Sequence, residues 1–122
     1  MGSAFDTFMT QIKTGIDLMH IPRFKRSVES GGREFLTRLF HEEELTNQDI
    51  EHLAGIYAAK EAVIKAFSLP TDAWKEIYIQ NDEKGSPRLT QLLNDRKILT
   101  HDLSISHDGE YVIAQFTALI EK

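Results

Sequence analysis

The chain has 122 residues, enough for one domain over residues 1–122 that buries a sizeable core. Charged residues make up 27% and hydrophobic residues 41%, as in ordinary globular domains, and the net charge of −5 argues against general nucleic-acid binding. Cysteine is absent, which excludes disulfides and thiolate catalysis, and no apolar run could span a bilayer, so we expect a cytoplasmic protein without membrane association.

The first part of the chain predicts an arm followed by a strand. Residues 1–10 are expected to be an extra arm or residues left by cloning. Over residues 11–19, aliphatic side chains alternate with polar ones or glycine, which is typical of a β-strand. The period of two places Asp17 on the face opposite to Ile16 and Leu18.

The next segment predicts two short helices and an acidic turn. A helix is expected to begin at Pro22, because proline fits the first helical turn, and to end at Gly31 and Gly32. Residues 34–40 are expected to form a second helix with its aromatic and leucine side chains facing inward. Residues 41–45 are predicted to form an acidic turn or a further short helix.

A long helix up to residue 67 organises the chain. Residues 46–49 are rich in N-cap types, Pro70 disfavours helix at the residue before it, and mostly strong helix formers lie between these signals. At about 100° per residue, one narrow arc of this helix carries Ile50, Leu53, Tyr57 and Ile64. Glu61 falls inside that arc, on the face that should be buried.

A carboxylate on an apolar face has two interpretations. Glu61 could pair with Lys65 four residues later, or extend to the rim of the buried face, and would then have no role in chemistry. Alternatively it faces a cleft and binds a metal ion, because burying an unpaired carboxylate is costly. A second carboxylate of the same kind would favour the metal site.

The rest of the chain predicts strands. The expected elements are strands at residues 75–80, 87–92, 103–107 and 111–119, a turn at 81–85 and a short helix at 92–98. Asp108-Gly109 is a strong hairpin signal between the last two strands. A strand, then helices, then mostly antiparallel strands indicate an α+β domain.

Charge is distributed unevenly along the chain, and residue types that bind metal and phosphate recur in three segments, at residues 15–17, 60–65 and 104–107. Between Lys13 and Arg38, six basic residues stand against three acidic ones, which indicates either a solvated face or a surface for an acidic partner. Asp17 on a strand and Glu61 on a helix are carboxylates, and lysines flank Glu61. Two carboxylates with lysines nearby suit Mg²⁺ and a phosphate chain.

In its motifs the chain resembles the holo-(acyl-carrier-protein) synthases, the small trimeric 4′-phosphopantetheinyl transferases. The matching motifs, in the family's order, are Gly15-Ile16-Asp17, Phe35-Leu36-x-Arg38, Leu53-Ala54-Gly55-x-Tyr57-Ala58-Ala59-Lys60-Glu61-Ala62-x-x-Lys65-Ala66, Gly85-x-Pro87 and Ser104-Ile105-Ser106-His107. The resemblance covers nearly the whole chain, and the motif around Glu61 is its most specific part.

The resemblance implies a 4′-phosphopantetheinyl transferase-like fold, an activity and the residues that perform it. The activity is transfer of 4′-phosphopantetheine from coenzyme A to a serine of an apo acyl-carrier protein in fatty acid biosynthesis, with release of adenosine 3′,5′-bisphosphate. Asp17 and Glu61 would bind Mg²⁺ and, with Lys65, form the catalytic set, while the general base is either Glu61 or a metal-activated water. The residues implied to bind coenzyme A are Lys60, Lys65, Gly85, Pro87, Ser104, Ser106 and His107, and those implied to contact the carrier are Arg23, Phe24, Arg26 and Arg38. The implied assembly is a homotrimer in which each site uses two neighbouring chains.

The chain departs from the family pattern at Lys13, where glycine is common, at His20, where an acidic residue is common, and at Ile56, where an arginine for the nucleotide phosphate is expected. Two alternatives therefore stay open. One is a catalytically weak module of the same fold that binds the carrier or the nucleotide. The other is a transferase that serves polyketide or peptide synthases.

Overall fold

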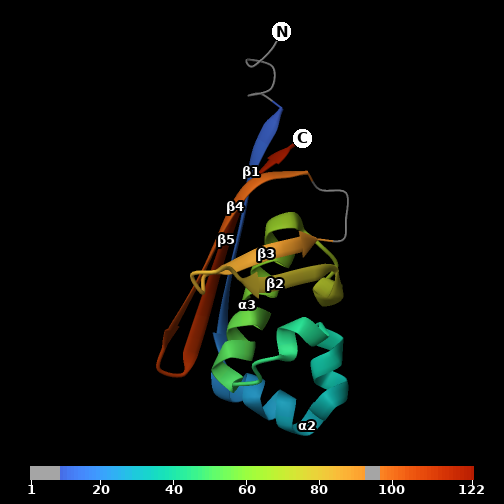
Figure 1. Cartoon of the computed structure of the whole chain (residues 1–122), viewed down its shortest axis with the longest axis vertical. Coiled ribbons are helices and arrows are strands. Elements are labelled where there is room, and N and C mark those ends of the chain that lie inside the picture. The colour runs from blue at the N-terminus through green and yellow to red at the C-terminus, as the bar shows by residue number, and fades with distance from the viewer. Residues whose placement is uncertain (1–8, 93–96) are drawn as a thin grey trace.

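The structure, a computed structural model, describes residues 9–92 and 97–122 and confirms the α+β class. Its elements are β1 (Thr10–His20), α2 (Ile21–Leu39), the 3₁₀ helix η1 (Glu42–Leu45), α3 (Ile50–Phe67), the 3₁₀ helix η2 (Ala73–Glu76), β2 (Ile77–Asn81), β3 (Pro87–Leu92), β4 (Ile98–Asp108) and β5 (Tyr111–Glu121). Three long strands run along one side of the molecule, with α3 beside them and α2 at one end (Figure 1). Within the described ranges, no helix is long and apolar enough to cross a membrane.

The long strands form an antiparallel sheet in the order β1-β5-β4, so the first strand of the chain pairs with the last. The predicted hairpin is present: Asp108 pairs with Tyr111, and Gly109 adopts a φ of 58°, which glycine tolerates without a steric penalty. The strand expected at 103–107 is longer than predicted, because β4 already begins at Ile98. A separate antiparallel pair, β2-β3, packs against α3 and β4.

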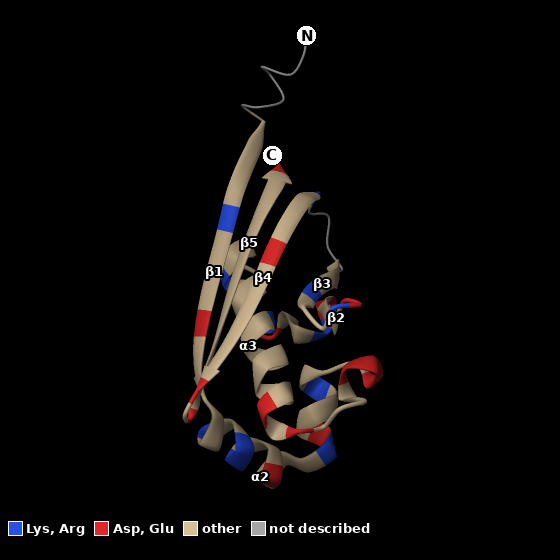
Figure 2. Cartoon of the chain, turned by 60° about the vertical axis from the view of Figure 1, so that its left-hand side comes forward, with Lys and Arg blue, Asp and Glu red and all other residues tan. Residues whose placement is uncertain are grey.

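The two faces of the long sheet differ in what they contact. One face packs against α3. The other face is open, and its exposed apolar side chains are Ile12, Ile16, Leu18, Tyr111 and Ile113. Figure 2 shows this side of the molecule, where charged residues are sparse along the three strands. The predicted alternation in β1 is thus present, with the aliphatic side chains pointing outward and Asp17 inward.

Helix α3 is the core of the fold. It begins at Asp49, whose carboxylate accepts a hydrogen bond from the His52 backbone N–H at 3.4 Å, as its N-cap sequence predicted. Most of its side chains are buried, because the sheet covers one side and β2 and α2 cover others. A run of alanines keeps the helix surface flat, and β1 approaches it closely at Gly15.

The predicted ends of three elements differ in how well they match the structure. Residues 21–39 form two helical segments, and Gly32, with φ 58° and ψ −147°, interrupts α2 between them as expected, although the second segment ends at Leu39 and not at Phe40. The strand predicted from residue 75 begins only at Ile77, because residues 73–76 close a 3₁₀ turn in which the Ile77 N–H bonds to the Trp74 carbonyl. The short helix predicted at 92–98 lies mostly outside the described residues.

Ser68 ends α3 in a left-handed conformation, with φ 53° and ψ 43°. Its N–H bonds to the Ile64 and Lys65 carbonyls, so this conformation closes the helix. A side chain makes the left-handed region costly, and Ser68→Gly should therefore raise the free energy of unfolding by about 0.5–1 kcal/mol in urea titrations. Ser68→Ala, which keeps a Cβ, is the matched control, and equal stability of the two variants would contradict this explanation.

Candidate functional site

Asp17 and Glu61 line the same cavity, although they are distant in sequence. The cavity measures about 300 Å³ and lies where the end of β1 meets α3 and the first turn of α2. Asp17 comes from β1 and Glu61 from α3, and the walls between them include Arg23 and Tyr57. The structure therefore brings together the two carboxylates on which the predicted metal site depends.

A close backbone contact produces this juxtaposition. A Cβ at Gly15 would lie 1.9 Å from the Ala62 carbonyl oxygen and 2.8 Å from the Ala66 nitrogen. Only glycine lets the strand rest directly on the helix backbone at this point. Asp17, two residues further along the strand, points to the same face as Gly15 and thus toward the helix that carries Glu61.

Lys65 lies on the strand side of the same helix. Its ammonium group donates to the Ile16 carbonyl at 3.0 Å and to Asp17 Oδ1 at 3.1 Å. The Lys65 side chain is 54% exposed and that of Asp17 15%, so the pair is accessible to a phosphate ligand. The predicted catalytic set of Asp17, Glu61 and Lys65 is therefore assembled at one place.

Two aromatic side chains surround the Glu61 carboxylate. The Trp74 indole N–H donates to Glu61 Oε1 at 3.0 Å. Burial raises the pKa of Tyr57 to about 12, and the charge of Glu61, a hydrogen bond to it and the charge of Asp17 act in the same direction. Tyr57 therefore keeps its proton at neutral pH. The sequence analysis did not identify Trp74 or Tyr57 as site residues.

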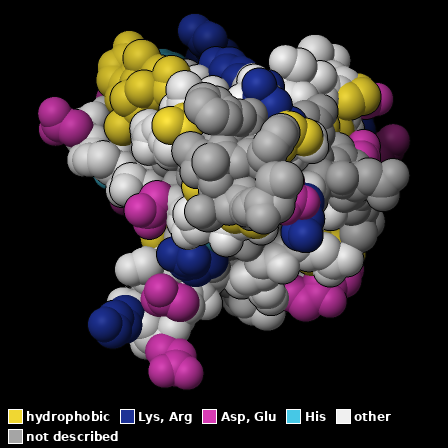
Figure 3. Space-filling view, turned by 90° about the horizontal axis from the view of Figure 1, so that it is seen from above, with side chains coloured by type: hydrophobic (Ala, Val, Ile, Leu, Met, Phe, Trp, Pro, Cys, Tyr) yellow, Lys and Arg dark blue, Asp and Glu magenta, His cyan; other side chains and the backbone are white. Residues whose placement is uncertain are grey.

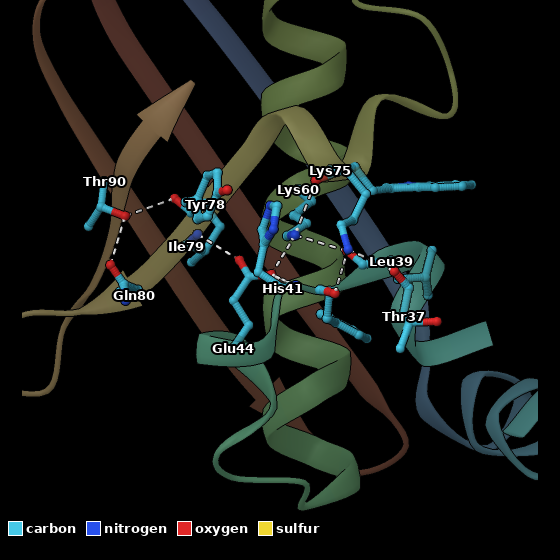
Figure 4. Close-up of polar contacts among 12 residues, drawn as sticks. Thr37, Leu39, His41, Glu44, Lys60, Lys75, Tyr78, Ile79, Gln80 and Thr90 are labelled. Carbon is cyan, nitrogen blue, oxygen red and sulfur yellow. Dashed lines mark hydrogen bonds and ion pairs between the residues drawn. The ribbon is translucent and has the colours of Figure 1, made fainter. Parts of the chain in front are cut away.

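Lys60 does not belong to this site, and the prediction that it binds coenzyme A is corrected by its burial. The side chain is fully buried, and its ammonium group donates to Leu39 O at 2.9 Å, Glu44 Oε1 at 2.6 Å and Trp74 O at 3.1 Å (Figure 4). A lysine has three N–H donors, and all three are used here. Burial lowers the pKa of Lys60 to about 8, although Glu44 opposes that effect.

A second cavity contains His107, Gly85 and Pro87, which were predicted to bind coenzyme A. It measures about 210 Å³, and its lining adds Ile56 and His52 from α3. Its lining residues differ from those of the carboxylate cavity. His107 Nε2 lies 3.3 Å from the Glu51 carbonyl oxygen, so the imidazole rests against the first turn of α3.

Ser104 and Ser106 do not join His107 in this cavity. Successive side chains of β4 alternate, so the two serines share one face of the sheet and His107 lies on the other. Ser104 instead lines a hollow with Gln115 and Thr117. That hollow lies on the open face of the sheet.

The residues predicted to contact the carrier lie on α2, and one of them needs correction. Arg23, Arg26 and Arg38 are exposed, and Figure 2 shows basic residues spread along α2. Phe24 is only 4% exposed, because its ring packs against Tyr57 and other aromatic side chains of the core. Phe24 therefore packs α2 against the core and does not belong to an exposed docking surface.

Asp17 and Glu61 suit a hard cation whose remaining ligands are water or phosphate oxygens. Within residues 9–92 and 97–122, no group of three or more His, Cys, Asp or Glu side chains is placed to bind a metal ion together. Mg²⁺ is commonly bound by one or two carboxylates, with water and phosphate oxygens completing its shell. Asp17 and Glu61 at one solvent-accessible cavity therefore fit Mg²⁺ bound together with a phosphate ligand.

Comparisons with known proteins point to one family. The model of the 4′-phosphopantetheinyl transferase superfamily matches residues 13–116. The holo-[acyl-carrier-protein] synthase of Sulfurovum sp. strain NBC37-1 is 36% identical, over 84% of this chain and 92% of that protein. That of Geobacter sulfurreducens is also 36% identical, over 83% of this chain and 91% of that protein.

Solved structures give the same result for the fold. The Helicobacter pylori holo-[acyl-carrier-protein] synthase in complex with coenzyme A superposes with a TM-score of 0.76 at 28% identity, covering 86% of this chain and 98% of that one. The coenzyme A complex from Chronobacterium ammoniagenes gives a TM-score of 0.75 at 32% identity, covering 92% and 98%. The chain therefore belongs to the holo-[acyl-carrier-protein] synthases of the 4′-phosphopantetheinyl transferase superfamily.

Proposed function

We propose that the protein transfers 4′-phosphopantetheine from coenzyme A to a serine of an apo acyl-carrier protein, with Mg²⁺ held by Asp17 and Glu61. The observation that carries the proposal is the meeting of these two carboxylates at one cavity, with Lys65 paired to Asp17, in a chain whose relatives are named holo-[acyl-carrier-protein] synthases. The ion, when bound, supplies charge neutralisation at the pyrophosphate.

In the proposed reaction, the serine Oγ attacks the phosphorus that bears pantetheine. The bond from that phosphorus to the bridging oxygen breaks, and adenosine 3′,5′-bisphosphate leaves with the electron pair. The serine proton passes to the Glu61 carboxylate or to water. Lys65, which is exposed beside Asp17, is placed to neutralise the charge that develops on the leaving phosphate.

The second cavity supports a nucleotide subsite. Gly85 and Pro87 offer a small, mostly backbone surface, and His107 offers ring nitrogens for a phosphate or a base. Among its described lining residues, the side chains able to carry positive charge are His52 and His107. Ile56, at the position where an arginine was expected, is buried, so the histidines would take over contacts to a nucleotide phosphate.

The open face of the long sheet supports a homotrimer. Ile12, Ile16 and Leu18 lie on one face of β1 and are 70%, 55% and 64% exposed, and such an apolar row is unusual for an uncovered surface. Hydrophobic side chains also gather at one edge of the molecule in the view from above (Figure 3). In a cyclic trimer, unlike patches of neighbouring chains meet, so the carboxylate cavity of one chain and the histidine cavity of the next could form one site.

Docking of the carrier should depend on the basic side chains of α2. We expect Arg26→Glu to raise the KM for the carrier about tenfold while the KM for coenzyme A stays nearly constant, and the carrier KM to rise with salt. The control is Arg33→Glu, whose native side chain already pairs with Glu42 at 2.7 Å. If Arg26→Glu changed the KM of both substrates equally, the helix would contribute to nucleotide binding or to folding and not to carrier binding.

Intact-mass measurement of a carrier protein tests the proposed function. The protein is incubated with coenzyme A, Mg²⁺ and an apo carrier of fatty acid synthesis, and the expected result is a mass gain of one phosphopantetheine. A carrier with its acceptor serine replaced by alanine should gain nothing. A protein that binds coenzyme A or carrier without any mass gain would be a binding module, the alternative that the buried Ile56 favours. Apo carriers of polyketide and peptide synthesis, assayed in parallel, distinguish the second alternative.

A further inference from the structure

Trp74 connects the buried core to the carboxylate cavity. Its backbone carbonyl accepts a hydrogen bond from the buried Lys60 ammonium at 3.1 Å, and its indole N–H donates to Glu61 Oε1 at 3.0 Å. Two consecutive residues of α3 therefore bind Trp74: Lys60 through its backbone carbonyl and Glu61 through its indole ring. Trp74 lies in η2, a turn of four residues that follows the helix, so these two bonds fix a segment outside α3.

On the core side, the Lys60 side chain that holds Trp74 makes further hydrogen bonds. Lys60 also donates to Leu39 O and Glu44 Oε1, while the other oxygen of Glu44 accepts from the Ile79 N–H at 2.8 Å. Figure 4 shows this network between α3, η1 and β2. Because the side chains of Lys60 and Glu44 are both buried, loss of the contact between them would leave a buried charge without a partner.

The ring of Trp74 also contacts Tyr57. Its centroid lies 6.2 Å from that of Tyr57 in an edge-on arrangement, and Tyr57 in turn lies 5.5 Å from Phe24 in the core. Glu61 is thus enclosed by an N–H donor, a phenol and ring edges on the helix side. Its carboxylate is oriented before any ligand enters the cavity.

We infer that Trp74 is a positioning residue of the transferase site, which holds the Glu61 carboxylate for Mg²⁺ through its indole N–H and is itself held by Lys60. The inference rests on the proposed role of Glu61. It gives Lys60 a function that differs from coenzyme A binding. Groups that hydrogen-bond to metal ligands typically change metal affinity or activity by about 10–100-fold when they are removed.

The test uses Trp74→Phe, which keeps an aromatic ring and removes the N–H, and compares it with Tyr57→Phe, which removes the phenol that also hydrogen-bonds to Glu61. In the full-length protein with saturating coenzyme A, we expect Trp74→Phe to raise the half-saturating Mg²⁺ concentration about tenfold while the KM for coenzyme A is unchanged. Mn²⁺ binding, measured by electron paramagnetic resonance, should weaken by the same factor without any turnover. Wild-type metal dependence in a folded Trp74→Phe variant would overturn the inference.

A second readout does not depend on a Trp74 variant. Trp74 is the single tryptophan of the chain, so tryptophan fluorescence reports on the surroundings of this ring, which include the contact with Glu61. Adding Mg²⁺ with coenzyme A should change the emission of the wild type but not that of Glu61→Gln. An unchanged wild-type emission would contradict the inference. If Glu61→Gln kept full transferase activity, the proposed function of Glu61 would fail instead, and the two failures are thereby distinguished.

Discussion

Asp17→Asn and Glu61→Gln should each lower the transferase kcat by at least about 10²-fold while the protein stays folded. Each change removes one of the two carboxylates that line the proposed metal cavity, and with it the charge that would hold Mg²⁺ against the pyrophosphate. The fold should survive, because the ion pair of Asp17 with Lys65 is partly exposed and such pairs contribute less than about 1 kcal/mol.

Circular dichroism and urea unfolding check the fold of these variants, and initial rates over a range of Mg²⁺ concentrations measure the loss. EDTA should stop the wild type, and added Mg²⁺ should restore it. Near-wild-type rates in either variant, or indifference of the wild type to EDTA, would remove the metal assignment.

Gly15→Ala should destabilise the protein by about 2 kcal/mol or more and abolish activity. The new Cβ would fall 1.9 Å from the Ala62 carbonyl oxygen, and backbone atoms of a buried helix cannot turn aside as a side chain can. Strand β1 must therefore move away from α3, which separates Asp17 from Glu61. Urea unfolding and the transfer assay measure both effects.

Gly55→Ala, in the helix α3 that Gly15 contacts, is the matched control. A Cβ there would lie 3.4 Å from Ile105 Cγ2 and 3.7 Å from His107 Nε2, which are ordinary contact distances. Alanine also favours helix by about 1 kcal/mol over glycine, so this variant should be as stable as the wild type or more so. If Gly15→Ala behaved like Gly55→Ala, close contact between β1 and α3 would not be what positions Asp17.

The elements that the sequence predicts well are those with local signals. Helix α3 has an N-cap at Asp49, and the last hairpin has its turn at Asp108-Gly109; both signals lie within a few residues of the structure they determine. The alternation in β1 predicts a strand with two faces, but it does not tell which face is covered. That depends on α3, which packs on the Gly15 side and leaves Ile16 outward.

The candidate site was predictable where motif and geometry coincide, as at Asp17, Glu61 and Lys65. Lys60 was not, because its partner Glu44 lies on another element and only the tertiary structure brings the two charges within 2.6 Å. Trp74 was missed for the same reason. A single tryptophan in a polar loop directly after a long helix was the signal that could have identified it.

The separation of Ser104 and Ser106 from His107 follows from strand alternation alone. In the trimer proposed above, a site that uses both serines and His107 would draw on two neighbouring chains. The carboxylate cavity and the histidine cavity, which have no lining residue in common, would likewise come from different chains. The central proposal is that one active site is built from two neighbouring chains.

Mixing two inactive variants tests this claim most directly. Glu61→Ala disables the carboxylate cavity and His107→Ala the histidine cavity, and each must first be inactive alone. When the two are unfolded and refolded together in equal amounts, random trimers with sites shared between two chains should recover about a quarter of the wild-type sites. Mixed oligomers that form, as shown by native mass spectrometry, but remain inactive would place the whole site within one chain and contradict the account.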